Sequence, residues 1–512
     1  MNRKNLLLIL FFLLDVTAFS QTIRIDSLRQ IWRNEVDTIF KFYTANCIDT
    51  LRGLTAEEWR EGVNDIYERV NNCNTKREYQ YALRYFGALI NDGHVEFPRN
   101  GIYNYEGIFQ KTDTIFPVWV KSWHDGRVFT VRDFSEQIPV HSEIISINGI
   151  PAKDIALKQR EIIPCEDRYV AAWTSSVLGG DPLYWTSFPN YLFCEKIHHP
   201  FVVEYSPTSD TVVYKITLSG LQRNEISRIY EKNEGKEIKE GFALIFSLGK
   251  NTVLYNKIND SIGTLKITMF LGSGVFRFLL AGGDTGFSKK LSKFMKQIQN
   301  DGIKHLIIDI RDNPGGYLYD VYELLAYFTN EKFTSPSVYK ITERSRNISA
   351  KMLKNEYKIF YNKKHPEVLR SMEIFNSMPN GSIFRSDTIL QMQYTTLKPI
   401  KYKYTGKVYL LTNGMSYSAS ILFTDLFKSR KLGLLAGESP GGYSNVSSGN
   451  VVEIQLPYSK FMSLTVPVGI ETRGKNEYIE PDIPIEPTFE EWLHGKHDSL
   501  QKLIAMILAN KI

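Results

Sequence analysis

The sequence is poor in cysteine and has little excess of either charge. Four cysteines occur in 512 residues, without a CxxC pair or a paired-histidine spacing near them, and this argues against a bound metal. Basic residues exceed acidic ones by only six, 62 against 56, and form no stripe interleaved with aromatic residues, so nucleic acid is set aside as a partner. The composition predicts a globular protein of about two to four domains.

Residues 1–20 are typical of an export signal. A basic start at Arg3 and Lys4 precedes the apolar run 6–14, and Ala18 puts a small residue near the cleavage point. The run is far shorter than the roughly 20 residues that a membrane span needs, and no cysteine is placed to carry a lipid anchor. We therefore expect export to the periplasm or the cell exterior, without a membrane span.

An oxidising compartment would allow the four cysteines to pair. Cys47 lies near Cys73, and Cys165 near Cys194. Two local bridges are the simplest connectivity, while free buried thiols remain an equal alternative in a protein of this size.

Residues 24–92 have the period of helices. Thr55 and Glu58 form a capping box before one of them. The last helix ends at Asp92, and His94 follows it at a glycine turn. A lone histidine in such a place is more often a surface or capping residue than a catalyst.

Between residues 116 and 163 the pattern changes to short strands. Residues 142–149, SEIISING, form the clearest strand, and a helix is predicted from near Lys153. The pattern EIISINGIPAKDI resembles a PDZ-like domain, a module that captures a peptide by adding it to its own sheet as a strand. Residues 164–250 alternate as further strands, to which we assign no chemistry.

An α/β pattern begins near Ser261. An alternating strand at 262–267, an amphipathic helix at 287–298 and a buried strand at 305–310 lead into the loop 311–316, RDNPGG. Because glycine tolerates positive φ and close approach, a Pro-Gly-Gly after a buried strand leaves N–H groups able to point into a cleft.

The stretch 407–442 has the order strand, tight turn, helix, strand. It places Ser418 at the start of a helix, just past the end of a strand. A helix N-terminus offers unpaired N–H groups and the positive end of a dipole, which suits a site where an oxyanion forms. From this stretch alone, Ser418 is either a nucleophile or a helix cap.

Together these motifs resemble the carboxyl-terminal processing, or tail-specific, serine peptidases and their tricorn-like relatives. The set, in order, is DGH, SEIISINGIP, LIIDIRDNPGG, VYLLTNGMSYSAS, AGESPGG and YIEPDIPIEPT, and it covers essentially the whole mature chain. The resemblance implies a crotonase-like spiral α/β core with Ser418 as nucleophile. It also implies an oxyanion hole formed by the amide of Ala419 and a glycine amide, Gly315 or Gly316.

The implied organisation has six parts. They are a signal peptide (1–20), an N-terminal helical region (21–100), a PDZ-like module (112–165), a β-rich connector (166–254), a peptidase core (255–490) with an insertion or lid (330–402), and a C-terminal helix (491–512).

The residue that activates the serine distinguishes two branches of these peptidases. The processing peptidases use a lysine after the second Gly-rich turn, where this sequence has Tyr443, a poor base at neutral pH. The tricorn-like branch uses a histidine at the place of His94, preceded by a serine where Gly93 stands here. The resemblance therefore implies His94 as general base.

A carboxylate is expected to support this histidine. The matching family position falls on Lys475, so the resemblance points to a neighbouring glutamate, Glu471 or Glu477. Asp92 is a local alternative.

The function implied is that of an exported serine endopeptidase that hydrolyses unfolded or extended polypeptides without a metal or cofactor. Two other functions stay open. One is a catalytically inactive peptide-binding or scaffold protein that retains the fold. The other is an acyl-CoA enzyme that shares only the core, against which the export signal argues, because coenzyme A is a cytoplasmic metabolite. No oligomeric state is predicted.

Overall fold

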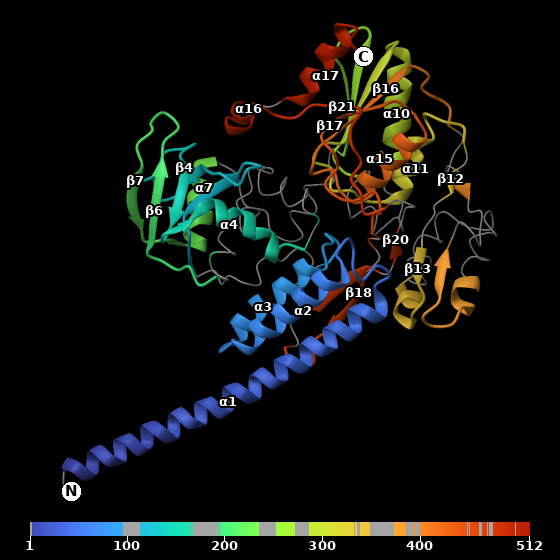
Figure 1. Ribbon diagram of the computed structural model, residues 1–512. Helices are drawn as coiled ribbons and strands as arrows, with labels where there is room; N and C mark the ends of the chain where they lie inside the picture. The colour runs from blue at the N-terminus through green and yellow to red at the C-terminus, as the bar shows by residue number, and fades with distance from the viewer. Residues whose placement is uncertain are drawn as a thin grey trace.

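The protein combines a helical N-terminal part, an antiparallel sheet and an α/β core (Figure 1). The computed structural model describes residues 3–95, 113–164, 166, 192, 195–234, 252–271, 286–331, 333–334, 338–348, 373–385, 393–394, 400–447, 449, 451–459, 463–467, 469–470, 475–496 and 498–512. Of the residues singled out in the sequence, Glu471, Cys165 and Cys194 lie outside the described residues.

Three helices open the chain. They are α1 (Arg3–Asn46), α2 (Ala56–Asn71) and α3 (Lys76–Leu89). The predicted capping box of Thr55 and Glu58 is confirmed at the start of α2. Helix α1 includes the predicted signal peptide, and its N-terminal half projects away from the rest of the molecule (Figure 1). In the described part of the chain, no helix combines the length and the apolar character that crossing a membrane requires.

The first predicted cysteine bridge is not formed. Cys47 and Cys73 are both buried as free thiols among the N-terminal helices. Each Sγ instead lies 3.2 Å from a backbone carbonyl oxygen, that of Asp49 and that of Arg69 respectively. Of the two alternatives that the sequence left open for this pair, the structure has the free buried thiols.

The second part is an antiparallel sheet. Its strands lie in the order β2 (Val118–Ser122), β3 (Val128–Asp133), β4 (Glu143–Ile147), β6 (Phe201–Ser206) and β7 (Tyr214–Leu218), and β5 (Ile150–Pro151) also pairs with β4. Around it lie β1 (Thr114–Ile115), which pairs with β8 (Leu221–Gln222), the helices α4 (Ala152–Lys158) and α7 (Arg223–Glu234), and the 3-10 turn η2 (Gln159–Ile162). The sequence separates a module from a connector here, but β6 and β7 of the connector segment belong to the same sheet as β2–β4.

The core is a six-stranded sheet. Its order is β21 (Ile483–Pro484), β17 (Leu434–Gly437), β16 (Lys407–Thr412), β11 (His305–Asp309), β10 (Ile262–Ile267) and β9 (Val253–Lys257), and all pairs are parallel except β9 with β10. Helices α10 (Phe287–Asn300), α11 (Leu318–Leu325) and α15 (Ala419–Ser429) cover one face, and α17 (Ser499–Leu508) covers the other. Leu306 and Ile308 point to the first face, Ile307 and Tyr409 to the second. This double burial explains why these strands have nearly continuous apolar sequences.

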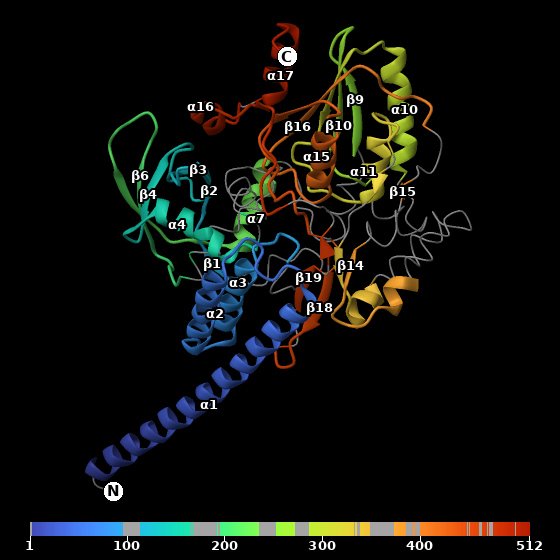
Figure 2. The same ribbon diagram turned by 45° about the vertical axis from the view of Figure 1, so that its right-hand side comes forward.

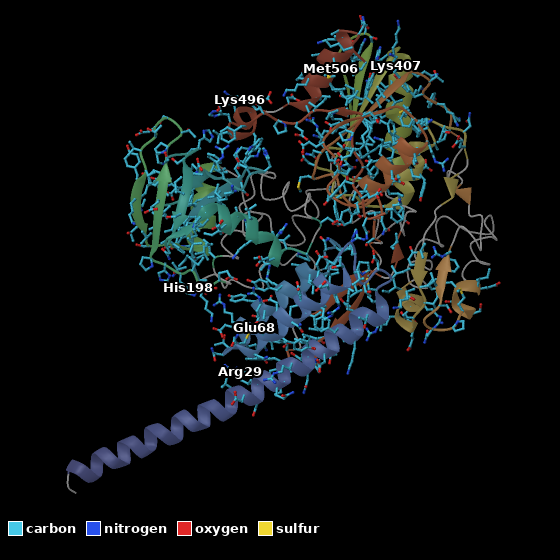
Figure 3. The ribbon with its side chains drawn as sticks, in the orientation of Figure 1. Arg29, Glu68, His198, Lys407, Lys496 and Met506 are labelled. Atoms are coloured by element: carbon cyan, nitrogen blue, oxygen red, sulfur yellow. The ribbon has the colours of Figure 1, made fainter. Side chains whose placement is uncertain are left out.

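The loops that follow the parallel strands gather at one edge of the core sheet, because parallel strands have their carboxyl ends on the same side. Lys407, the first residue of β16, and Met506 of α17 both lie at the top of Figure 3, whereas Glu68 of α2 lies in its lower part. Strand β16 therefore runs toward the N-terminal helices. The loop after it, which ends at Ser418, faces α3.

Segments from late in the chain return to the N-terminal helices. The hairpin β18 (Val451–Gln455) and β19 (Ser463–Pro467) lies beside α1 (Figure 2). The buried Glu35 carboxylate of α1 accepts hydrogen bonds from the backbone N–H groups of Tyr458 and Ser459 at the turn of this hairpin, at 2.6 and 2.8 Å. These bonds tie the hairpin to the helical part.

The described pieces of the predicted insertion, 330–402, include small strands and short helical stretches at 343–348 and 373–377. Strand β13 (Val338–Lys340) pairs with β14 (Ile383–Arg385) and with β20 (Gly469–Ile470), and β12 (Phe333–Thr334) pairs with β15 (Gln393–Tyr394). In the C-terminal segment, the short helix α16 (Phe489–Leu493) precedes α17. Through α16 this segment packs on the antiparallel sheet, where Trp492 contacts Trp123 and Phe129.

Helix α15 carries a partly buried acid whose charge costs stability. Burial raises the pKa of Asp425 to about 6, while an unfolded aspartate titrates near about 3.9. The folded state therefore binds more protons between these values, and stability falls as pH rises through this window. We expect Asp425→Asn to raise the free energy of unfolding by about 2 kcal/mol at pH values above about 7 and to change it little near about pH 4. Urea denaturation at the two pH values measures this, and an equal change at both would contradict the assignment.

Candidate active site

Ser418 lies on strained backbone at the start of α15. Its φ is 56° and its ψ is −117°, a conformation that non-glycine residues rarely adopt and that persists only where the surroundings impose it. The neighbouring serines impose it here. The Ser416 hydroxyl donates to the Ile310 carbonyl at 2.8 Å, and the Ser420 hydroxyl to the Asn313 carbonyl at 2.9 Å. Both serines thus bind the nucleophile loop to the loop after β11.

The Ser418 side chain does not cap the helix. Its Oγ lies 2.9 Å from Nε2 of His94. Of the two readings left open by the sequence, the structure favours the nucleophile, because an imidazole within hydrogen-bond distance is what a serine needs to lose its proton. The two residues stand 324 positions apart in the chain.

The DGH turn after α3 brings His94 to this place. Asp92 is buried, and its Oδ1 accepts a hydrogen bond from the His94 backbone N–H at 2.8 Å while lying 3.2 Å from the ring Nδ1. A carboxylate can only accept, so Nδ1 carries the proton and Nε2 is left as an acceptor for the Ser418 hydroxyl. The Ser418–His94–Asp92 contacts therefore have the logic of a catalytic triad.

The other oxygen of Asp92 is also bound. Its Oδ2 lies 3.0 Å from Nε of the buried Arg52, and the Ser447 hydroxyl donates to the same oxygen. Burial alone would raise the pKa of Asp92, but Arg52, His94 and Ser447 together hold it below its usual range. Asp92 is thus an anion at neutral pH.

Glu477, one of the two glutamates suggested by the resemblance, does not occupy this position. Glu477 is exposed, and the hydrogen bonds of its backbone go to Ser444 and Lys475. Glu471 falls outside the described residues. Asp92, the local alternative, is the carboxylate that contacts His94.

Tyr443, which stands where the processing peptidases have lysine, lies over Arg52. The Arg52 guanidinium is 5.9 Å from the centre of its ring, and Tyr478 packs on it at 4.9 Å. Tyr443 thus packs beside the partner of Asp92.

Two amide groups can form an oxyanion hole beside Ser418. The N–H of Gly315 is engaged within its own loop, donating to Asn313 Oδ1 at 2.9 Å. By contrast, the N–H groups of Gly316 and Ala419 have no hydrogen-bond partner among the described residues. A Cβ on Gly315 would lie 2.7 Å from Ser418 Cβ and 2.8 Å from Ala419 N. Gly315 therefore permits the close approach of the two loops, and Gly316 with Ala419 has the free donors.

No group of three or more histidine, cysteine, aspartate or glutamate side chains suited to a metal ion occurs in the described part of the chain. The chemistry available at the site is that of a serine, an imidazole and a carboxylate. This set, on a strained strand-to-helix turn with two amides that lack a partner within the described part of the chain, is the set that serine hydrolases use.

The family comparison agrees with this class. The model of peptidase family S41 matches residues 261–485, which run from the start of β10 to the last strand of the core sheet. Over these residues the chain is similar to peptidase family S41, and this match together with the site indicates a serine peptidase.

Solved structures of CPAF have a similar fold over nearly the whole chain. The structure of mature CPAF complexed with lactacystin has 14% sequence identity and a TM-score of 0.55, over 94% of this chain and 100% of that chain. Mature CPAF itself has 14% identity and a TM-score of 0.54, over 94% and 98%. The photosystem II D1 C-terminal processing protease has 12% identity and a TM-score of 0.37, over 92% and 98%. No curated protein sequence matches the chain.

Arg52 and Ser447 are the site residues that no motif indicated. Arg52 follows α1 in a turn at positive φ, 36°, and Ser447 follows the second Gly-rich turn. Their contacts with Asp92 span 40 and 355 positions of the chain (92 − 52 = 40). The only available signal was the charge of an arginine beside a turn, which is too common to be specific.

Proposed function

We propose that this chain is an exported serine endopeptidase that cleaves unfolded or extended polypeptides through an acyl-enzyme on Ser418. The observation that carries the proposal is the 2.9 Å contact between Ser418 Oγ and His94 Nε2. His94 takes the serine proton as Oγ attacks the peptide carbonyl, and then gives it to the leaving amine. Water attacks the ester in the second half, with His94 again as base.

The oxyanion formed in each half would accept hydrogen bonds from the N–H groups of Gly316 and Ala419. Each such donor is worth about 3 kcal/mol of transition-state stabilisation. Asp92 would hold the imidazole in the productive tautomer and stabilise its protonated form.

The antiparallel sheet supports the choice of an extended substrate. We propose that it is a PDZ-like module, and that the core is of the crotonase-like spiral type. In such a module the substrate chain is held by main-chain hydrogen bonds at a sheet edge. A folded protein has no free extended segment to form these bonds. Export is proposed from the signal-like residues 1–20.

A serine-directed phosphonate tests the proposal against an inactive peptide-binding protein of the same fold. We expect the wild type to be labelled once and the Ser418→Ala variant to remain unlabelled, while the wild type degrades an unfolded protein and spares its folded form. The Ser429→Ala variant is the matched control, because that serine is exposed at the last residue of the same helix. Equal labelling of wild type and Ser418→Ala, or none of either, would reject the peptidase.

A further inference from the structure

A second buried carboxylate, Glu166, binds two residues that flank the triad. Its Oε1 lies 2.6 Å from Nη2 of Arg52, and its Oε2 accepts a hydrogen bond from the Tyr417 hydroxyl, also at 2.6 Å. All three side chains are buried. Arg52 forms an ion pair with Asp92, and Tyr417 immediately precedes Ser418.

Tyr417 closes the connection back to the histidine turn. Its hydroxyl accepts a hydrogen bond from the Gly93 N–H at 2.9 Å. Its ring centre lies 5.5 Å from that of His94. A closed circuit of hydrogen bonds and ion pairs therefore runs from Gly93 through Tyr417 and Glu166 to Arg52 and Asp92.

Two motif glycines make room for this circuit. A Cβ on Gly93 would lie 2.5 Å from the Tyr417 hydroxyl oxygen, so no side chain fits before the histidine while Tyr417 is in place. A Cβ on Gly442 would lie 2.9 Å from Cε2 of Tyr417 and 3.4 Å from Oε1 of Glu166. The glycines of the DGH and SPGG motifs thus pack around the same two side chains.

The circuit also sets the charge around the imidazole. Arg52 is one cation between two carboxylates, those of Asp92 and Glu166, so the buried group carries an excess negative charge until His94 is protonated. Tyr43 of α1 and Cys47, the residue after α1, add no charge at neutral pH, because burial raises the pKa of both, that of Cys47 to about 11.

The remaining titratable neighbours lie on the Arg52 side of the circuit. The half-buried Asp49 carboxylate accepts a hydrogen bond from the backbone N–H of Arg52 at 2.9 Å, and Tyr443 packs on the Arg52 guanidinium. An aspartate there adds to the negative field and does not cancel it.

We propose that Glu166 and Tyr417 are positioning residues of the peptidase reaction, Tyr417 by fixing the backbone before His94 and Glu166 by supplying charge that balances the imidazolium. This inference rests on the proposed function. Tyr417 locks the histidine turn, contributed by the helical part, to the nucleophile loop, contributed by the core. Loss of this bond removes one connection between two segments that lie 324 positions apart and must meet at the 2.9 Å contact.

Two near-isosteric variants separate the two roles. Tyr417→Phe removes the hydroxyl and leaves every charge, whereas Glu166→Gln keeps the shape and removes one negative charge. We expect each to lower kcat per active site by about 10- to 100-fold, because small displacements of catalytic groups have effects of this size, with KM nearly unchanged. Protonation of His94 is disfavoured in Glu166→Gln only, so only that variant moves the acidic limb of the pH–rate profile to lower pH.

Active sites are counted by phosphonate titration, so that an unfolded fraction does not enter kcat. Glu57→Gln, which neutralises an exposed carboxylate in the first turn of α2, is the control and keeps the wild-type kcat. Wild-type kcat per titrated site in both variants, or an unmoved acidic limb in Glu166→Gln, would overturn the inference. A wild type that neither hydrolyses protein nor reacts with phosphonate would instead refute the proposed function.

Discussion

The His94→Ala variant is expected to hydrolyse an unfolded protein about 10⁵- to 10⁶-fold more slowly than the wild type, the size of loss found when the base of a serine triad is removed. Without Nε2, the Ser418 hydroxyl has no acceptor for its proton and the leaving amine has no donor. The oxyanion amides are untouched, so a residual rate above that of water remains. The measurement is kcat and KM with a reduced, unfolded substrate.

His198→Ala is the matched control for that experiment. His198 is exposed on the antiparallel-sheet part (Figure 3) and is expected to be dispensable. A His94→Ala rate within about tenfold of the wild type would be far too small a loss for a general base and would remove His94 from the mechanism. Restoration of part of the rate by added imidazole would support the assigned role further.

The Asp92→Asn variant is expected to lose about 10⁴-fold in kcat. An amide offers His94 Nδ1 either a donor or a weaker acceptor, so the tautomer with a free Nε2 is no longer enforced. The substitution also leaves Arg52 with one anion fewer in a buried site. Steady-state kinetics measures the first effect, and a loss below about tenfold would place the supporting carboxylate elsewhere.

The same variant has a pH signature in stability. The pKa of Asp92 is lowered in the folded state, so its ionised form contributes stability that is fully present above the unfolded value of about 3.9 and disappears as pH falls through the folded value. The stability deficit of Asp92→Asn is therefore expected to be largest at neutral pH and to shrink below about pH 4. A deficit independent of pH would contradict the ion pair with Arg52.

Local patterns allowed much of the fold to be predicted. The buried strand before RDNPGG, the strand–turn–helix around Ser418 and the capping box at Thr55 depend on residues close in sequence, and each is found in the structure. Ser418 was recognisable because a hydroxyl at a helix start after a strand is a local feature. Its backbone strain could not be predicted, because the conformation of this loop depends on hydrogen bonds with the loop after β11, which is distant in sequence.

The rest of the site depends on contacts that no local pattern contains. Asp92 is only a local alternative in the sequence, because the resemblance puts the carboxylate position at Lys475, beside Glu471 and Glu477. In the structure the DGH turn brings its own carboxylate to His94. Glu166 reaches Arg52 across 114 positions and Tyr417 across 251. The contacts of Glu166 depend on how three parts of the chain pack together. The sequence around this glutamate contains no pattern that indicates them.

In the proposed mechanism, Oγ of Ser418 carries the acyl group. The most direct measurement is mass spectrometry of the wild type acid-quenched during turnover of an ester or peptide substrate, with the adduct mapped by peptide sequencing. The account predicts one acyl group, on Ser418, that does not accumulate in His94→Ala. Turnover with no adduct on Ser418, or with an acyl group on another residue, would contradict it.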